Sequence, residues 1–183
     1  MHEFPVVFGE TLFAQYAGAL WHERHRAMEK LDFTLNINGS DHSLSVEPRR
    51  TLADVIRENC GLTGTHIGCE HGVCGACTVI IDGEPMRSCL MFAVQAVGKS
   101  IRTVEGLADG DDLHPLQKKF TEHHALQCGF CTPGFLMLAL SALERDPDIS
   151  DEALREILSS NLCRCTGYVN IVRAVRSYRD AGK

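Results

Sequence analysis

The sequence lacks the features of several large protein classes. No run of apolar residues approaches the about 18 that a membrane-spanning helix needs, and the longest comparable stretch, 135–143, contains Ser141. Positive charge is also scarce, because 18 lysines and arginines stand against 24 aspartates and glutamates and the formal net charge is −6. Nucleic acids and anionic membranes both favour a basic protein surface. We therefore expect no nucleic-acid partner and no insertion into a membrane.

We do not expect residues 1–30 to act as a secretory signal. They have no basic start, and Glu3, Glu10 and Gln15 interrupt their apolar residues. We therefore expect a cytoplasmic protein, whose thiols are kept reduced. What the sequence has in excess is cysteine, with nine in 183 residues. In a reducing compartment, clustered cysteines bind metal more often than they form disulfides.

The first half of the chain has the pattern of an α+β domain over 31–106. Alternating apolar residues and tight-turn signals such as Asn38-Gly39 predict β-strands. The strands are expected at 32–37, 43–46, 78–81 and 101–104. Thr51 is expected to cap a short helix that runs through Glu58. The segment 61–77 contains five glycines and is predicted to be a loop.

The second half follows a linker at 106–112 and is predicted to be helical. Four helices are expected at 115–124, from 132 through 143, at 151–159 and at 166–179. Thr132 is expected to cap the second of these, with Pro133 at its first helical position, and Ser150 to cap the third. The apolar residues of 135–143 are therefore expected to form a bundle core.

The first four clustered cysteines are Cys69, Cys74, Cys77 and Cys89. A C-x4-C-x2-C spacing with a distant fourth cysteine is the ligand pattern of plant-type [2Fe–2S] sites. Glycines between the ligands let the backbone approach a small cluster closely, so that N–H groups can reach its sulfides. The alternatives are a zinc site or free buried thiols, and the four-residue gap suits zinc poorly. The spacing therefore favours an iron–sulfur cluster.

The second group consists of the pair Cys128 and Cys131 and the pair Cys163 and Cys165. By itself this pattern is also consistent with a redox-active Cys-x2-Cys motif or with a zinc site. No βαβ pattern surrounds it, as a thioredoxin-like motif would require. Both pairs directly precede predicted helix starts, and helix N-termini offer partial positive charge and free N–H groups to an anionic cluster. These observations favour a second cluster without excluding zinc.

Four stretches closely resemble the small iron–sulfur subunit of molybdenum hydroxylases, the family of xanthine oxidase, aldehyde oxidoreductase and carbon monoxide dehydrogenase. They are 68–78 (GCEHGVCGACT), Ser88-Cys89, 127–134 (QCGFCTPG) and 161–168 (NLCRCTGY). The resemblance covers about residues 31–180. It implies an N-terminal plant-type ferredoxin β-grasp domain at 31–106 and a four-helix bundle domain at 113–180. It also implies that both tetrads hold [2Fe–2S] clusters. Residues 1–30 are predicted from their own pattern to form a helical extension before these domains.

The resemblance further implies the function and the partners. In this family a large subunit carries the molybdopterin cofactor with molybdenum and hydroxylates the substrate, and a medium subunit carries FAD. Electrons pass from the pterin to the helical-domain cluster, then to the ferredoxin-domain cluster and then to FAD. Gln127 and Cys165 would lie against the pterin. The expected assembly is a dimer of heterotrimers.

The chain itself is expected to carry electrons and to have no catalytic residue, because eight thiolate ligands leave no open position for a substrate. Its ligand loop, 70–73 (EHGV), is more similar to subunits of N-heteroaromatic hydroxylases than to those of carbon monoxide dehydrogenases. The alternatives are a small subunit of a carbon monoxide dehydrogenase or aldehyde oxidoreductase. A free-standing ferredoxin is less favoured because a shuttle needs only one cluster, and a zinc-stabilised interaction module is the remaining class.

Three further residues near the motifs, Cys60, His71 and Arg164, are given no ligand role. Cys60 is interpreted as a spare thiol and His71 as a surface residue, whereas Arg164 is either solvated or raises the potential of its cluster. The extension departs from the family pattern. Residues 10–28 are predicted to form an amphipathic helix that docks on a partner or on the rest of this chain, through Leu12, Phe13, Tyr16 and Leu20.

Overall fold

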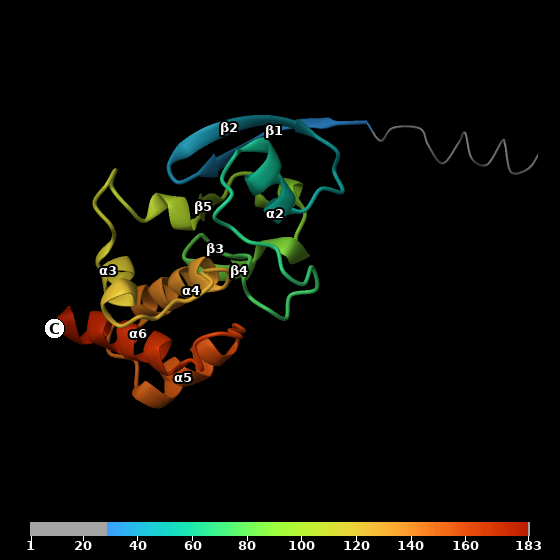
Figure 1. The fold of residues 1–183 in the computed structure, drawn as a ribbon. Helices are drawn as coiled ribbons and strands as arrows, with labels where there is room; N and C mark the ends of the chain where they lie inside the picture. The colour runs from blue at the N-terminus through green and yellow to red at the C-terminus, as the bar shows by residue number, and fades with distance from the viewer. Residues whose placement is uncertain (1–28, 183) are drawn as a thin grey trace, which may run out of the picture.

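The computed structural model describes residues 29–182, in which a β-sheet lies beside a group of α-helices (Figure 1). All five strands precede residue 103 and the four longer helices follow it. This mixed α/β composition agrees with the predicted order of elements. The helix predicted at 10–28, with its apolar residues, lies outside the described residues.

The sheet begins with a hairpin formed by β1 (Leu31–Ile37) and β2 (Ser40–Val46). The tight turn between them needs two residues in the left-handed region, and Asn38 and Gly39 have φ of 52° and 78°. The predicted strand and turn are confirmed. The returning strand begins at Ser40, earlier than the predicted start at 43.

The other strands are β3 (Thr78–Ile81), β4 (Glu84–Arg87) and β5 (Ser100–Arg102). The strand order is β2-β1-β5-β3-β4, and only the β1–β5 pair is parallel. The sequence did not indicate β4, because a proline within a short segment argues against a strand. Pro85 is tolerated here because β4 lies at the edge of the sheet. The prediction that the last strand reaches residue 104 is wrong, because the chain turns into a 3-10 helix at Val104–Gly106.

A short helix, α2 (Leu52–Asp54), continues into a π-helical turn at Val55–Asn59 and packs on the sheet. Thr51 caps it as predicted, because its side-chain oxygen accepts the Asp54 N–H at 3.1 Å. The buried apolar residues of this part form one core. They are Leu35, Ile37, Val46, Leu52, Val55, Ile56, Val79, Ile81, Ala93, Ala96 and Ile101. The segment 61–77 forms neither strand nor helix, as predicted.

The second half forms α3 (Pro115–Glu122), α4 (Thr132–Arg145), α5 (Asp151–Ser159) and α6 (Val169–Ala181). Ser150 caps α5 as predicted, through the N–H of Ala153. The predicted cap at Thr132 is wrong, because Cys131 is the N-cap and the Thr132 hydroxyl is buried without a hydrogen-bond partner.

The fourth helix also begins later than predicted, at Val169 instead of 166. Thr166 accepts the Tyr168 N–H at 3.2 Å, and Tyr168 has a left-handed φ of 68°. The side chain of Thr166 therefore closes the cysteine loop and does not cap a helix that starts there.

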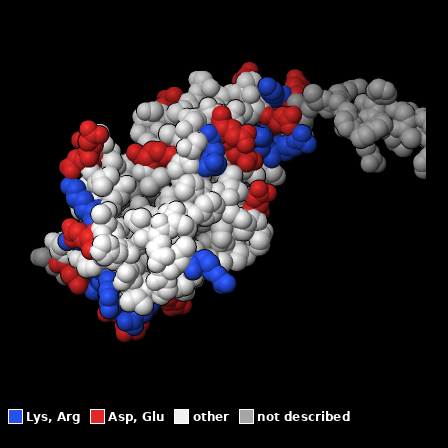
Figure 2. Space-filling model, viewed as in Figure 1, with Lys and Arg blue, Asp and Glu red and all other residues white. Residues whose placement is uncertain are grey.

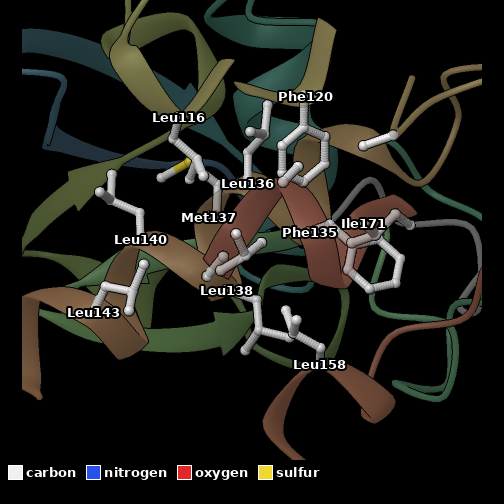
Figure 3. Packing of buried hydrophobic residues seen from close by; sticks show 14 of the residues in the cluster. Leu116, Phe120, Phe135, Leu136, Met137, Leu138, Leu140, Leu143, Leu158 and Ile171 are labelled. Carbon is white, nitrogen blue, oxygen red and sulfur yellow. The ribbon is translucent and has the colours of Figure 1, made fainter. Parts of the chain in front are cut away.

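Helix α4 lies at the centre of the second hydrophobic core (Figure 3). All of its residues from Gly134 to Leu143 are buried, which confirms the core assignment of 135–143. Its neighbours in this core include Phe120 of α3, Leu158 of α5 and Ile171 of α6, as Figure 3 shows. Ile80 of β3 belongs to the same core, so α4 packs against the sheet as well as against the helices.

Polar contacts also fasten α4 to the sheet. The Ser141 hydroxyl donates to the Gly83 carbonyl at 2.8 Å, and Arg102 holds Glu144 through two nitrogens at 2.9–3.0 Å. On the face drawn in Figure 2, side chains of both charges alternate around the margin and a broad area between them carries few charges. Among residues 29–182, no helix is long and apolar enough to cross a membrane.

Candidate metal centres

The first tetrad lies where the loop 61–77 meets the β3–β4 hairpin. The loop supplies Cys69, Cys74 and Cys77, and the 3-10 turn after β4 supplies Cys89. Cys77 directly precedes β3, and β4 runs antiparallel to β3, so the hairpin returns Cys89 to the side of Cys77. Ser88 fixes this return, because its N–H and hydroxyl both donate to the Cys77 carbonyl, at 3.3 and 2.7 Å.

Backbone N–H groups of the loop point at the Cys69 sulfur. The Cys74 N–H approaches it at 3.4 Å, and the amides of His71 and Val73 also donate to it. These donors, with Cys74 first, lower the pKa of the Cys69 thiol to about 6. The loop therefore stabilises a negatively charged sulfur before any cation is bound.

In the first tetrad each thiol whose pKa is raised interacts most strongly with one neighbouring thiol, Cys74 with Cys69 and Cys89 with Cys77. Burial, together with the neighbouring Cys69 thiol, raises the pKa of Cys74. Burial also raises the pKa of Cys89 to about 12, with Cys77 adding to the effect. Coordination to a metal deprotonates a thiol outright, so a bound cation would remove this penalty.

The second tetrad joins the N-terminus of α4 to the loop between α5 and α6. Here too the thiols interact in two pairs, with the Cys128 and Cys165 Sγ atoms 3.4 Å apart and Cys131 interacting most strongly with Cys163. The Cys163 N–H donates to the Tyr168 hydroxyl at 3.0 Å, which holds the loop against the start of α6.

The four thiols of the second tetrad also differ in pKa. The N–H of Phe130 lowers the pKa of Cys128, whereas burial raises that of Cys131 to about 12. For Cys163, burial raises the pKa, but the hydrogen bonds from Thr166, Cys165 and Cys131 together outweigh burial and the pKa is lowered. Within the Cys131–Cys163 pair, the Cys163 thiol therefore ionises more readily than the Cys131 thiol beside it. A shared positive centre would bring both to the thiolate form.

Both donor sets fit a two-iron cluster. All nine cysteines are free thiols, and each tetrad presents two sulfur pairs. Four thiolates on a two-iron cluster divide as two per iron. A zinc ion instead needs its ligands to converge on one point. Within the described residues, no three His, Cys, Asp or Glu side chains converge in that way.

The loops of the two tetrads touch each other. The N–H of Leu162 donates to the carbonyl of Cys74 at 2.9 Å, so a ligand of the first tetrad is hydrogen-bonded to the residue before Cys163. On another side, the ring of His66 stacks on Phe130 with centroids 4.9 Å apart. The His66 Nδ1 lies 2.8 Å from the Phe130 carbonyl oxygen. The tetrads are therefore joined by direct contacts across the boundary between sheet and helices.

The remaining predicted residues lie at the margins of these loops. Gln127 is exposed beside Cys128, and Cys165 is half-buried against Cys128. Cys60 is half-buried beside the sheet core, and burial raises its pKa. His71 is exposed and its Nδ1 contacts the Cys69 carbonyl. Arg164 is exposed between two cysteines.

Sequence reasoning missed the residues that join the two loops, above all Asn161, Gly75 and Arg87. Asn161 and Gly75 both lie inside recognised cysteine motifs but had no role there other than spacing. The one signal in the sequence was the glycine at position 75, between two predicted ligands. It was interpreted as a position where the backbone comes close to a cluster. The partner that fills this space comes from 86 positions further along the chain.

Comparison with known proteins agrees with this geometry. Residues 35–100 match a family described as a 2Fe-2S iron-sulfur cluster binding domain, and residues 103–176 match a [2Fe-2S] binding domain. The chain is 58% identical over 147 residues to the caffeine dehydrogenase subunit gamma of Pseudomonas sp. strain CBB1, covering 79% of this chain and 88% of that one. It is 54% identical over 147 residues to the nicotine 6-hydroxylase small subunit of Paenarthrobacter nicotinovorans, covering 80% and 88%.

A solved structure shows the same fold. The chain superposes on a chain of quinoline 2-oxidoreductase from Pseudomonas putida 86 with a TM-score of 0.80 and 54% identity. The match covers 84% of this chain and 96% of that one. With both [2Fe–2S]-binding regions present in order and relatives matched over most of their length, the chain belongs to the family of small iron–sulfur subunits of molybdenum hydroxylases.

Proposed function

We propose that the two tetrads are the ligand sets of the two [2Fe–2S] clusters through which this electron-transfer subunit works. The first set is Cys69, Cys74, Cys77 and Cys89. The second set is Cys128, Cys131, Cys163 and Cys165. The observation that carries the proposal is the division of each tetrad into two sulfur pairs, with a direct hydrogen bond between the two loops.

The sulfur pairs suggest which cysteines share an iron. In the first cluster, Cys69 and Cys74 would bind one iron and Cys77 and Cys89 the other. In the second, the pairs would be Cys128 with Cys165 and Cys131 with Cys163.

When bound, each cluster supplies a site that accepts one electron. The chain's own residues then have three tasks. The amides directed at Cys69 and Cys128 stabilise the negative charge that a reduced site gains. Burial of Cys77 and Cys163 limits access of water. The Leu162–Cys74 hydrogen bond keeps the two sites adjacent.

Exposed apolar residues beside each tetrad support a place between two partner subunits. Val73 and Leu90 flank the first tetrad and are 55% and 61% exposed, and Phe130 and Leu162 flank the second at 46% and 50%. Large apolar side chains at such positions are typical of protein interfaces. We propose that the second tetrad faces the large molybdopterin-binding subunit, with Gln127 and Cys165 against the pterin. The first tetrad would face the medium FAD-binding subunit.

The finer organisation belongs to the same proposal. The ferredoxin β-grasp domain would span 31–106 and the four-helix domain 113–180, which the matches at 35–100 and 103–176 support. A dimer of heterotrimers in the cytoplasm is the proposed assembly and location.

The substrate of the complex is proposed to be an N-heteroaromatic compound. Caffeine, nicotine and quinoline, which appear in the names of three similar proteins, all contain an aromatic ring with nitrogen. The alternatives are an aldehyde or carbon monoxide. The native complex should be purified with its partners and offered quinoline, benzaldehyde and carbon monoxide with an artificial electron acceptor. Turnover of either alternative in preference to the heteroaromatic compound would overturn the substrate assignment.

The ligand assignment is tested by removing one cysteine from each tetrad. The wild-type chain should hold about four irons and give two EPR signals after reduction. Cys77→Ser and Cys163→Ser should each leave about two irons and one signal, and the lost signal should differ between them. Cys60→Ser is the matched control and should keep both signals. Bound zinc, or loss of iron in the Cys60 variant alone, would refute the assignment.

A further inference from the structure

The side chain of Asn161 is buried between the two cysteine loops, where the cluster ligands do not require it. It is 1% exposed and lies two positions before Cys163. A buried amide is costly unless its polar atoms are satisfied, so the presence of Asn161 requires an explanation.

Both ends of the Asn161 amide face Gly75, which lies between Cys74 and Cys77. The Nδ2 group donates to the Gly75 carbonyl at 3.4 Å. The Oδ1 atom has no conventional partner. A Cβ on Gly75 would lie only 2.0 Å from this oxygen, so the oxygen points at the Cα hydrogen that glycine carries there. This is the arrangement of a weak Cα–H···O contact, and it accounts for an otherwise orphaned oxygen.

The Gly75 carbonyl is a meeting point of several elements. It accepts the N–H of Thr78 at 3.2 Å and the Thr78 hydroxyl at 2.6 Å, in addition to Asn161. Helix α4 also lies against it, because a Cβ on Gly134 would be 2.2 Å from this oxygen. Movement of Asn161 therefore acts on an atom that the ligand loop, β3 and α4 all contact.

Arg87, at the end of β4, binds Ser160, the residue before Asn161. Its Nη2 donates to the carbonyl of Ser160 at 2.9 Å and lies 3.3 Å from the Ser160 hydroxyl. Its Nη1 donates to the Thr78 hydroxyl. Residues 160–162 are thus held at three successive positions, by Arg87, by Gly75 and by the Cys74 carbonyl.

We propose that Asn161 is a positioning residue for electron transfer, which fixes the separation of the two clusters by clamping Gly75. The inference rests on the proposed function, since it presupposes a cluster on each loop. A leucine of similar volume would fill the same space but would hold neither the carbonyl nor the Cα of Gly75. The hydrogen bond and the close contact that the amide makes with Gly75 hold the two loops in one relative position.

The experiment compares Asn161→Leu and Asn161→Asp in the full chain with the control Asn170→Leu. Asn170 donates from Nδ2 to the His124 carbonyl at the same 3.4 Å, but this contact lies within the helical part. The first readout is the splitting that the two reduced clusters impose on each other's EPR signals. The splitting depends on the inverse cube of their separation. It should shrink in both Asn161 variants and stay unchanged in the control.

The second readout is hydrogen exchange of the segment that contains the Leu162 amide, which needs no cluster. Exchange there should be on the order of tenfold faster in the Asn161 variants, the factor for loss of one hydrogen bond's stability. Unchanged splitting and unchanged exchange in both variants would overturn the proposal. A wild-type chain without two iron–sulfur signals would instead refute the proposed function, while the exchange comparison would still decide the role of Asn161.

Discussion

Replacing Gly134 by alanine is expected to destabilise the protein, although alanine is the better helix former. Gly134 is the third residue of α4, and its Cβ would lie 2.2 Å from the Gly75 oxygen and 3.1 Å from the Ala76 Cα. Carbon and oxygen rarely approach closer than about 3.3 Å, so α4 or the ligand loop must shift by about 1 Å. The gain of about 0.5–1 kcal/mol expected in an open helix is outweighed by about 1–3 kcal/mol for overpacking. Because the obstructing atoms are backbone and cannot rotate away, we expect a net loss of about 1–2 kcal/mol.

The assay is the apparent thermal midpoint of the iron-loaded chain, followed by circular dichroism under anaerobic conditions. The loss corresponds to a fall of roughly 2–8 °C for a chain of this size. Gly182→Ala is the matched control, since the nearest atom there is 3.5 Å away and φ is −85°. A Gly134→Ala variant as stable as the wild type would refute the close approach of α4 to the ligand loop.

Two further predictions concern charge. In the metal-free chain at pH 7, Cys69 should be alkylated by iodoacetamide faster than Cys89, because the Cys74 N–H lowers the pKa of Cys69 to about 6 and burial raises that of Cys89 to about 12. The Cys69 rate should fall as the pH drops through 6, and equal labelling of the two peptides by mass spectrometry would contradict the thiol environments described above. Arg102→Met should cost no more than about 1 kcal/mol of unfolding free energy, because the Arg102 and Glu144 side chains are 38% and 41% exposed. That loss should shrink in high salt, and a larger, salt-independent loss in urea unfolding would show that the pair contributes more than a surface interaction.

The parts of the fold that were predictable are those set by local sequence. The Asn38-Gly39 turn, the Thr51 and Ser150 caps and the glycine-rich cysteine loop each depend on a few adjacent residues, and the structure has them as predicted. The cysteine spacing was informative for the same reason, since three ligands of the first tetrad lie within nine residues of one another.

The failures occur where the contacts of a cysteine loop decide the local structure. Thr132 has a good capping side chain, yet Cys131 takes the N-cap position, and its thiol interacts with Cys163 of the loop between α5 and α6. Thr166 likewise turns toward the Cys163 sulfur, at 3.1 Å, and leaves the start of α6 to Tyr168. In both cases the cysteine loop determines where the helix begins. The capping preference of a single threonine does not predict that start.

The contacts between the loops bear on how electrons cross the chain. The segment 106–112 that links the two halves was predicted to be a linker, and a linker by itself would leave the separation of the tetrads variable. Instead, α4 shares a core with Ile80 of β3, and both Gly134 and Asn161 lie in close contact with Gly75. The spacing of the two tetrads is therefore set by buried packing at the boundary and not by the connecting segment. Because tunnelling rates fall steeply with distance, a fixed boundary of this kind would keep the transfer rate between the two proposed cluster sites the same from molecule to molecule. Gly75, Gly134 and Asn161, which lie within or beside the cysteine motifs, would therefore influence electron transfer through the spacing of the two sites.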